Sequence, residues 1–589
     1  MSKLRALGSC LAAAIVVTTV QASSGPRVRP ADGIGAGLQA AFAAQEEVTY
    51  LIVMKEQGVA AGAADSALDR DTRGWMVYRA LKDAADRSQA PVLALLAGER
   101  AAGRVRQVRP FFSVNAIAVV ARALPPAAIA NHPAVDYIVP SSVITVPPLE
   151  QGTAAAQVNA IEWNIAKVRA PEVWASGFRG QGIVVAHIDT GARFDHPALV
   201  GKYRGNQGNG AFDHNYNWFD PPHGCGNPSL APCDLNGHGT ATMGTMLGDD
   251  GAGNQIGMAP DARWIACDAL PSGSGTTVSL IACGDWMLAP TDLSGQNPDP
   301  ARRPDVINNS WGNSGGDTFF QTILQNWRTA GIFPAFANGN NGPTCLSSGS
   351  PGDNPEAFSA GATDINDALA SFSARGPSTL SFGIKPDVSA PGVNIRSSAR
   401  TGGYGAFTGT SMASPHVAGL VALLWSKFPN LRGDVAGTES MIRPAALMIN
   451  AGGCGIGPED QPNNLYGWGR IDARRAVQAF PIHTDRSVYR PGHTLTVSVS
   501  LLNRLPAPQS VDLYVGVQGP SGPAVLISMF TTTMAANQKT LNVPLFNHTW
   551  TLIDPAGPYT FFSIMTARGV SPANPANWLS VDAAPVTKF

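Results

Sequence analysis

Short β-branched, apolar runs alternate with helical patterns between Ala160 and about Phe480, and this alternation limits the possible folds more than any other feature. The predicted strands span residues 183–188, 264–269, 305–309 and 332–337. The predicted helices begin near His238, Val278, Phe319 and Ser411. Strands that alternate with helices form βαβ units. We therefore expect residues 161–480 to form an α/β unit whose mostly parallel sheet has helices on both faces.

The chain has 589 residues, which is too many for one ordinary hydrophobic core, so further units are expected. Residues 46–140 show strand-like runs at 48–54 and 116–121 around a helical stretch at 75–96, which predicts a small α/β unit. Residues 141–160 contain Pro147, Pro148 and Gly152 followed by an alanine run at 154–156, so they are predicted to form a linker open to proteolysis. Period-two alternation after Pro481 predicts an all-β sandwich over 481–589.

The N-terminus has the pattern of a signal peptide. Lys3 and Arg5 precede an apolar run over 11–20, and small residues follow it, so cleavage is expected near Ala22. The run is about half as long as a membrane span, which disfavours an anchor. We therefore predict that residues 1–22 are a signal peptide, that the remaining chain is secreted to an extracellular location, and that no membrane attachment remains after cleavage.

Seven cysteines are present, and Cys10 lies within the predicted signal peptide. The other six are Cys225, Cys233, Cys267, Cys283, Cys345 and Cys454. An even number in an exported chain favours up to three disulfides, for which 15 connectivities exist. The short loops favour Cys225–Cys233 and Cys267–Cys283. The alternative, a metal site, lacks the usual C-x-x-C pair.

The overall composition excludes two classes of protein. The chain is 44% hydrophobic and 14% charged, so it is too apolar to be disordered. Its formal net charge of -1 provides no strong field to hold nucleic acid or an anionic membrane. Neither partner is expected.

Four short segments carry reactive side chains. Asp189 ends an apolar strand, His238 lies between two glycines at a helix start, Ser411 opens another helix, and Asn340 lies in an Asn-rich turn after a strand. Each has an ordinary structural interpretation on its own: a turn cap, a buried histidine, an N-cap and a loop residue. Together they supply the carboxylate, base, nucleophile and oxyanion donor that acyl transfer requires.

The order of these segments and their motifs resemble the subtilisin family. The motifs are Asp-Thr-Gly at 189–191, Gly-His-Gly-Thr at 237–240 and Gly-Thr-Ser-Met-Ala-Ser-Pro at 409–415, and the resemblance covers residues 162–477. Glu-Trp-Asn at 162–164 and His-Pro-Ala-Leu at 196–199 resemble the bacillopeptidase F-like branch. The resemblance implies a subtilisin-like fold and a serine endopeptidase in which Asp189 orients His238, His238 is the base and Ser411 is the nucleophile. It also implies an oxyanion hole formed by Asn340 and the Ser411 N–H.

The resemblance also implies a substrate-binding groove. Ser310, Trp311 and Gly312 match the segment that pairs with the substrate main chain and walls the P1 pocket, and Gly349 matches the floor of that pocket. A neutral, glycine-floored pocket favours apolar P1 residues. Trp311 departs from the family pattern, in which a smaller apolar residue is common there. Asn338 departs from it as well, because a small residue is usual at that position.

The region 46–140 resembles the family's prodomain, which acts as inhibitor and chaperone, and autocleavage is expected within 141–160. The expected partners are protein or peptide substrates and the chain's own prodomain. No cofactor is expected for the chemistry. The family often binds structural calcium, for which Asp249, Asp250 and Asn254 are candidate ligands, and ordinary solvated loop charges are the alternative.

Two other functions remain open. The first is a catalytically silent binding or adhesive protein that keeps the same fold and displays the C-terminal sandwich. The second is a maturation protease dedicated to one partner, which a narrow cleavage profile would distinguish from a broad digestive enzyme. All four expected reactive residues are present, which favours an enzyme over the silent protein.

Overall fold

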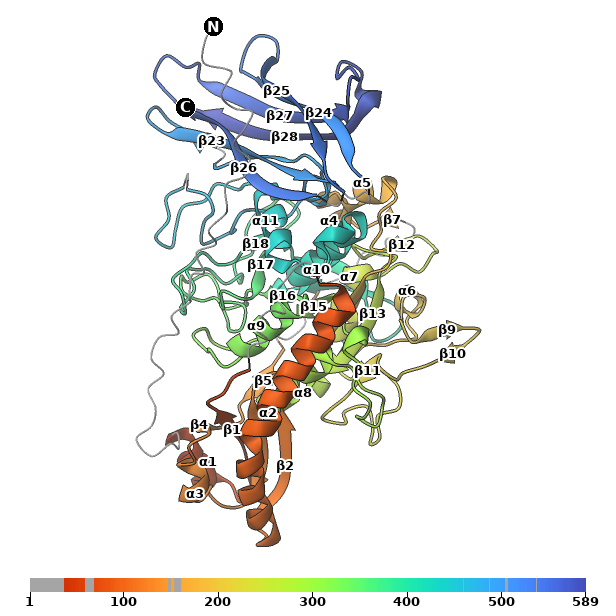
Figure 1. The fold of residues 1–589 in the computed structure, drawn as a ribbon, viewed down its shortest axis with the longest axis vertical. Coiled ribbons are helices and arrows are strands. Elements are labelled where there is room, and N and C mark those ends of the chain that lie inside the picture. The colour runs from red at the N-terminus through yellow and green to blue at the C-terminus, as the bar shows by residue number, and fades with distance from the viewer. Residues whose placement is uncertain are drawn as a thin grey trace.

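The computed structural model describes residues 36–58, 68–146, 150–152, 160–458, 460–486, 488–503, 507–536 and 538–589. The predicted signal peptide, residues 1–22, and much of the predicted linker lie outside these ranges. Three units follow one another along the described chain, and Figure 1 shows them stacked along its long axis.

A seven-stranded sheet forms the centre of the middle unit, in the order β11-β13-β8-β15-β16-β17-β18. Every neighbouring pair in it is parallel. Its strands are β8 (Val184–Asp189), β11 (Trp218–Phe219), β13 (Arg263–Asp268), β15 (Val306–Asn309), β16 (Phe333–Ala337), β17 (Phe358–Thr363) and β18 (Val388–Pro391). This confirms the predicted parallel sheet, and the four predicted strands agree with the observed ones to within a residue or two.

Helices cover both faces of this sheet, because successive side chains of its strands point to opposite faces and apolar side chains occur on both. Strand β8 is an example. Val185 and its neighbour Ala186 point to opposite faces, and each belongs to a different hydrophobic core. The Val185 core contains α7 (His238–Leu247) and α10 (Thr410–Lys427). The Ala186 core contains α8 (Thr277–Leu288) and α9 (Gln321–Thr329). The predicted α/β fold is thereby confirmed.

The N-terminal unit has a four-stranded antiparallel sheet in the order β2-β3-β1-β4. Its elements are α1 (Ala36–Ala44), β1 (Val48–Met54), α2 (Arg70–Ala101), β2 (Val105–Phe111), β3 (Ala116–Ala121), α3 (Ala127–Ala130) and β4 (Val135–Pro140). Helix α2 is longer at both ends than the predicted 75–96, and Asp69 caps its first turn. Strand β2 was not predicted, because charged residues interrupt its apolar pattern.

The C-terminal unit is the predicted β-sandwich. One sheet has the order β21-β23-β26 and the other β22-β28-β27-β24-β25. Inward-facing residues of both sheets, such as Val497 and Leu513, share one core. The strands are β21 (Ile482–Thr484), β22 (Val488–Tyr489), β23 (Thr494–Leu502), β24 (Gln509–Gln518), β25 (Val525–Met534), β26 (Lys539–Thr549), β27 (Gly557–Ala567) and β28 (Trp578–Lys588).

Two short strands of the region between the first two units add to the middle unit. Strand β5 (Val143–Thr145) pairs antiparallel with β14 (Ser274–Thr276). Strand β6 (Glu150–Gly152) pairs antiparallel with β20 (Tyr404–Thr408). The remaining larger elements are β7 (Ala160–Ile161), α4 (Trp163–Lys167), α5 (Ala170–Ala175), α6 (Pro197–Val200), β9 (Asn206–Gly208), β10 (Ala211–Phe212), β12 (Asn254–Gln255), β19 (Ile395–Ser398), α11 (Val435–Ala445) and α12 (Ala473–Ala476).

Three disulfides join the six cysteines. The predicted pairs Cys225–Cys233 and Cys267–Cys283 are confirmed, and Cys345 is bonded to Cys454. Across the described ranges, no helix combines the length and the apolar character that crossing a bilayer requires.

Candidate active site

The carboxyl ends of three adjacent strands bring the predicted site residues to one edge of the sheet. Asp189 is the last residue of β8, Ser310 follows β15, and Asn340 lies three residues after β16. Open α/β sheets bind their ligands at this edge, since the loops that follow the strands meet there.

Asp189 and His238 form a buried hydrogen-bonded pair. The Nδ1 atom of His238 lies 2.7 Å from Oδ1 of Asp189, and neither side chain is exposed. The Thr190 N–H also donates to Oδ1, at 2.8 Å. Burial alone would raise the pKa of Asp189, but His238 and the other donors hold it below its usual value. Asp189 is therefore an ionised carboxylate that fixes the orientation of the His238 ring.

The other ring nitrogen of His238 is available for proton transfer. His238 is the first residue of α7, and its Nε2 atom is buried with no hydrogen-bond partner among the residues that the structure describes. An imidazole held through Nδ1 with Nε2 open is the arrangement that a general base requires.

Ser411 and Asn340 converge beside Gly409. A methyl group added to Gly409 would lie 2.8 Å from Oγ of Ser411 and 3.3 Å from Nδ2 of Asn340, so only glycine leaves this point open. Ser411 lies in the first turn of α10, where backbone N–H groups have no helical acceptor. No hydrogen bond joins Ser411 Oγ to His238 Nε2 in the described structure, and catalytic hydrogen bonds often tighten only when substrate binds.

The predicted substrate-binding residues line one cavity of about 420 Å³. Ser310, Trp311, Gly312, Gly349 and Asn340 all contribute to its wall, and none of its lining residues is charged. The Trp311 ring packs against Phe320 and Phe336, so it extends into the adjoining core. The cavity can therefore hold an uncharged side chain.

The structure adds functional neighbours that the sequence patterns did not identify. Thr410 donates to Oδ1 of Asn340 from its backbone N, at 2.9 Å, and from its Oγ1, at 2.7 Å. The Ser414 hydroxyl donates a hydrogen bond to Oδ1 of Asn308, and Nδ2 of Asn308 donates to the Ser310 hydroxyl. The Ser310 hydroxyl donates in turn to the Ser411 carbonyl, at 3.0 Å. These contacts hold Asn340 and the start of α10 in place. In the sequence, the only signal for the role of Thr410 is that it directly precedes Ser411.

Two further polar residues near the site have structural surroundings. His416 lies inside α10, bonded to the Met412 carbonyl and to Asn164, and burial lowers its pKa to about 4. It is a neutral, buried histidine. Asn338 donates to the Ala374 carbonyl and accepts from Ser359, so its amide holds two neighbouring segments together.

The candidate calcium ligands do not converge on a cation site. Oδ2 of Asp249 pairs with Arg179 at 3.3 Å, and Oδ1 of Asn254 accepts from Arg396 at 2.8 Å. Asp250 accepts from Asn254 and Tyr404. Two guanidinium groups and two further donors thus occupy oxygens that a hard cation would need. The donor set of this loop does not fit calcium.

The chain's own residues Val143–Val146 lie along the cavity. Strand β5 pairs with β14, the Val146 N–H donates to the Gly273 carbonyl at 3.0 Å, and Thr145 and Val146 contribute to the cavity wall. An extended segment paired with an edge strand is the usual mode of peptide recognition by strand addition. The groove therefore holds an extended segment of the chain itself.

Comparison with known proteins identifies the family. A model of the subtilase family matches residues 180–469. Bacillopeptidase F of Bacillus subtilis (strain 168) is 38% identical over 476 residues, which are 76% of this chain and 32% of that protein. Subtilisin of Bacillus pumilus is 33% identical over 279 residues, which are 46% of this chain and 86% of that protein. Subtilisin E of Bacillus subtilis (strain 168) is 32% identical over 289 residues, which are 48% of this chain and 65% of that protein.

The match thus spans about a third of bacillopeptidase F and just under two thirds of subtilisin E. The chain therefore belongs to the subtilase family, in the branch that resembles bacillopeptidase F.

Proposed function

We propose that the chain is the precursor of a secreted serine endopeptidase that hydrolyses peptide bonds through Asp189, His238 and Ser411. The observation that carries the proposal is the buried Asp189–His238 pair, 2.7 Å long, at the carboxyl end of β8. Ser310 follows the adjacent strand β15 and donates to the Ser411 carbonyl, and Ser411 Oγ and Asn340 Nδ2 converge beside Gly409. The names of the relatives support a peptidase of this kind. The signal peptide predicted from residues 1–22 supports export.

The chemistry follows from the geometry. Oγ of Ser411 attacks the carbonyl carbon of the scissile bond while Nε2 of His238 takes the hydroxyl proton. The carbonyl oxygen becomes an oxyanion that accepts hydrogen bonds from Nδ2 of Asn340 and from the Ser411 N–H. His238 then gives its proton to the leaving amine, and the C–N bond breaks. A water molecule attacks the resulting acyl-enzyme with His238 again as base, which releases the acid and restores Ser411.

The substrate class is a protein or peptide bound in extended conformation. The uncharged lining of the cavity at Ser310–Gly312 and Gly349 supports an apolar P1 side chain. Cleavage of a mixed peptide library tests this preference. A broad apolar profile supports a general endopeptidase, and cleavage at one narrow motif would instead favour a dedicated maturation protease.

Residues 46–140 act as an inhibitory prodomain in this proposal. The turn between β2 and β3 docks on the middle unit: the N–H groups of Phe112 and Ser113 donate to Asp285 of α8 at 3.1 and 2.8 Å, and Asn326 of α9 donates to the Ser113 carbonyl. Strand β5 and Val146, which follow the N-terminal unit, lie along the groove, and this supports blocking of substrate access. We expect autocleavage within 141–160, on the C-terminal side of Val146.

Replacing Ser411 by alanine tests the mechanism. The Ser411→Ala chain loses the nucleophile, so it is expected to remain uncut and to show no peptidase activity, while the wild-type chain yields a shorter product. Gel electrophoresis and N-terminal sequencing measure the cut, and a chromogenic peptide measures the activity. Autoprocessing that persists in the purified variant would refute the mechanism. A wild-type chain that folds but cleaves nothing would favour the silent binding protein.

A further inference from the structure

Helix α2 (Arg70–Ala101) packs into the hydrophobic cores of two units. Its 32 residues extend about 48 Å. Val92 and Leu96 in its C-terminal half pack into the core of the N-terminal unit, whereas Val77 and Leu81 pack into the core that contains α8 and α9. Figure 1 shows α2 running from the small sheet up across the middle unit. The helix therefore does more than cover its own sheet.

The first turn of α2 contacts the middle unit at the amino ends of the central strands. The candidate active site lies at the opposite, carboxyl ends. Arg70 donates from Nε to Oδ1 of Asp305 at 2.9 Å, from Nη1 to the Ala301 carbonyl at 2.7 Å, and from Nη2 to the Arg303 carbonyl. Asp305 directly precedes β15, at its amino end, while Ser310 follows its carboxyl end. The first turn of α2 thus contacts the middle unit at the amino end of β15.

Arg73, one turn along the helix, enters a slot between two glycines. Its Nη1 donates to the Gly433 carbonyl at 2.8 Å. A methyl group on Gly331 or Gly433 would lie only 3.0 or 3.1 Å from that nitrogen. Both glycines have positive φ, 77° and 83°, and together they leave the space that the guanidinium needs. We call Arg70 and Arg73 with these contacts the arginine anchor.

The surface that receives the anchor keeps its shape through bonds inside the middle unit. Arg432 makes two bonds to Asp305, at 2.8 and 2.7 Å, and the Val184 N–H makes a third at 2.9 Å. Burial would raise the pKa of Asp305, but Arg70 and Arg432 hold it below its usual value. Because Asp305 keeps these partners when Arg70 leaves, the anchor can dissociate without unfolding the receiving surface.

We infer that the arginine anchor is a further binding site for the prodomain, distinct from the groove segment and from the β2–β3 turn, and that it keeps the prodomain bound after autocleavage. This inference rests on the proposed function, since it assumes that the chain is cut C-terminal to Val146. Cleavage there releases only the groove segment, and Arg70 stays bonded to a carboxylate that is almost fully buried. Loss of one partner of such a pair acts mainly on the dissociation rate.

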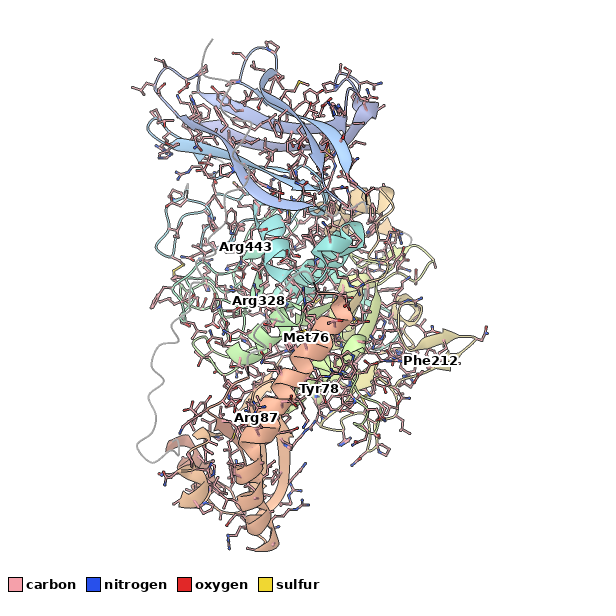
Figure 2. The ribbon with its side chains drawn as sticks, in the orientation of Figure 1. Met76, Tyr78, Arg87, Phe212, Arg328 and Arg443 are labelled. Atoms are coloured by element: carbon pink, nitrogen blue, oxygen red, sulfur yellow. A yellow bond between two sulfur atoms is a disulfide. The ribbon has the colours of Figure 1, made fainter. Side chains whose placement is uncertain are left out.

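The test uses the full chain with Arg70→Ala and Arg73→Ala combined. After autocleavage, size-exclusion chromatography measures the prodomain that co-elutes with the rest, and hydrolysis of a small peptide measures the lag before activity. We expect prodomain release to be at least about 30-fold faster in the double variant. The matched control is Arg87→Ala, on the same helix in Figure 2. Arg87 is exposed, and among the residues that the structure describes its ion-pair partner is Glu56 of its own unit. Equal release in all three chains would overturn the inference.

A second measurement separates this inference from the proposed function and from a folding defect. In the uncut Ser411→Ala chain, hydrogen exchange of residues 70–82 reports whether the start of α2 is held. Adding the two arginine substitutions is expected to raise exchange there by at least tenfold and to leave residues 184–189 of β8 unchanged. Unchanged protection of 70–82 would overturn the anchor. If the wild-type chain is never cut, the proposed function fails, and this measurement still decides whether the anchor exists.

Discussion

Thr410 determines which end of the Asn340 amide faces the groove. Its N–H and hydroxyl both donate to Oδ1 of Asn340, so the amide cannot rotate without losing two hydrogen bonds. Nδ2 is left facing the point beside Gly409 that Ser411 Oγ also approaches. A donor that is oriented before the oxyanion forms needs no reorganisation during the reaction. Thr410 is therefore a positioning residue for Asn340.

Thr410→Val is expected to lower kcat about tenfold and to change KM less than twofold. The valine removes one of the two bonds that orient Asn340, and a lost hydrogen bond of this kind costs about 1–1.5 kcal/mol. Steady-state kinetics on a small peptide measures both constants. Thr410→Ser keeps the hydroxyl and should restore most of kcat. A rise in KM at constant kcat would show that Thr410 acts on substrate binding instead.

Asp268 is a buried carboxyl group whose raised pKa lowers the free energy of unfolding at high pH. Burial, with Asp220 and Asp234 nearby, raises its pKa to about 9. Between an unfolded value near 3.8 and this folded value, the folded chain holds a proton that the unfolded chain releases. Stability therefore falls as the pH rises through this window.

Asp268→Asn should remove that loss, because the amide stays neutral and its oxygen can still accept the Leu270 N–H. In the Ser411→Ala background, we expect the variant to gain on the order of 1–3 kcal/mol over its parent at pH 8 and clearly less at pH 5. Denaturant unfolding at the two pH values measures the difference. An equal gain at both values would show that Asp268 is already ionised when folded.

The loop after β16 is the element that carries Asn340, and a disulfide ties it to a distant part of the chain. Cys345 is bonded to Cys454 across a sequence separation of 109 residues, whereas Cys225 and Cys233 are 8 apart. In the chain-entropy view, a longer closed loop restricts the unfolded state more. The Cys345–Cys454 disulfide should therefore stabilise the fold more than the Cys225–Cys233 disulfide.

Replacing both Cys345 and Cys454 by serine is expected to cost about 2 kcal/mol more stability than replacing both Cys225 and Cys233. Each pair is changed together in the Ser411→Ala background, so that no free thiol remains and no autolysis occurs. Unfolding midpoints in denaturant compare the two double variants. Losses of equal size would mean that strain or residual structure outweighs the loop length.

At the scale of the whole molecule, the sandwich packs against the middle unit away from the groove. Leu502 of β23 lies in the core that contains α10, and Arg475 of α12 lies 3.5 Å from Asp582 of β28. The Phe480 N–H donates to Ser580. Among the described residues, the cavity lining includes none from 481–589. This placement favours a stabilising role.

Deletion of 481–589 is expected to lower the melting temperature and to leave kcat/KM on a small peptide within about threefold, because the groove is unchanged and the core around Leu502 is opened. Comparing soluble and insoluble protein substrates then separates the possible roles. Parallel changes on both agree with a stabilising unit. A selective loss on insoluble substrate would instead assign substrate binding to the sandwich, and failure to fold would assign it a chaperone role.

Local patterns in the sequence determined the elements of the parallel sheet and the composition of the candidate site. Alternation along 184–189 and helix starts at His238 and Ser411 depend on periodicity and capping, which neighbouring residues decide. The short-loop disulfides were predictable for the same reason, because chain length alone holds Cys225 near Cys233. The roles of Asp189, His238 and Ser411 stay predictions that the Ser411→Ala chain tests.

Only the tertiary structure decided the contacts between segments far apart in the chain. The orientation of Asn340 by Thr410, the Cys345–Cys454 bond and the contact of Arg70 with Asp305 each join residues separated by 70 or more positions. The extra length at the N-terminal end of α2 has the same origin, since its first turn is held by the middle unit. No local pattern encodes such contacts, because they exist only after the cores pack and bring the loops at the sheet edges together.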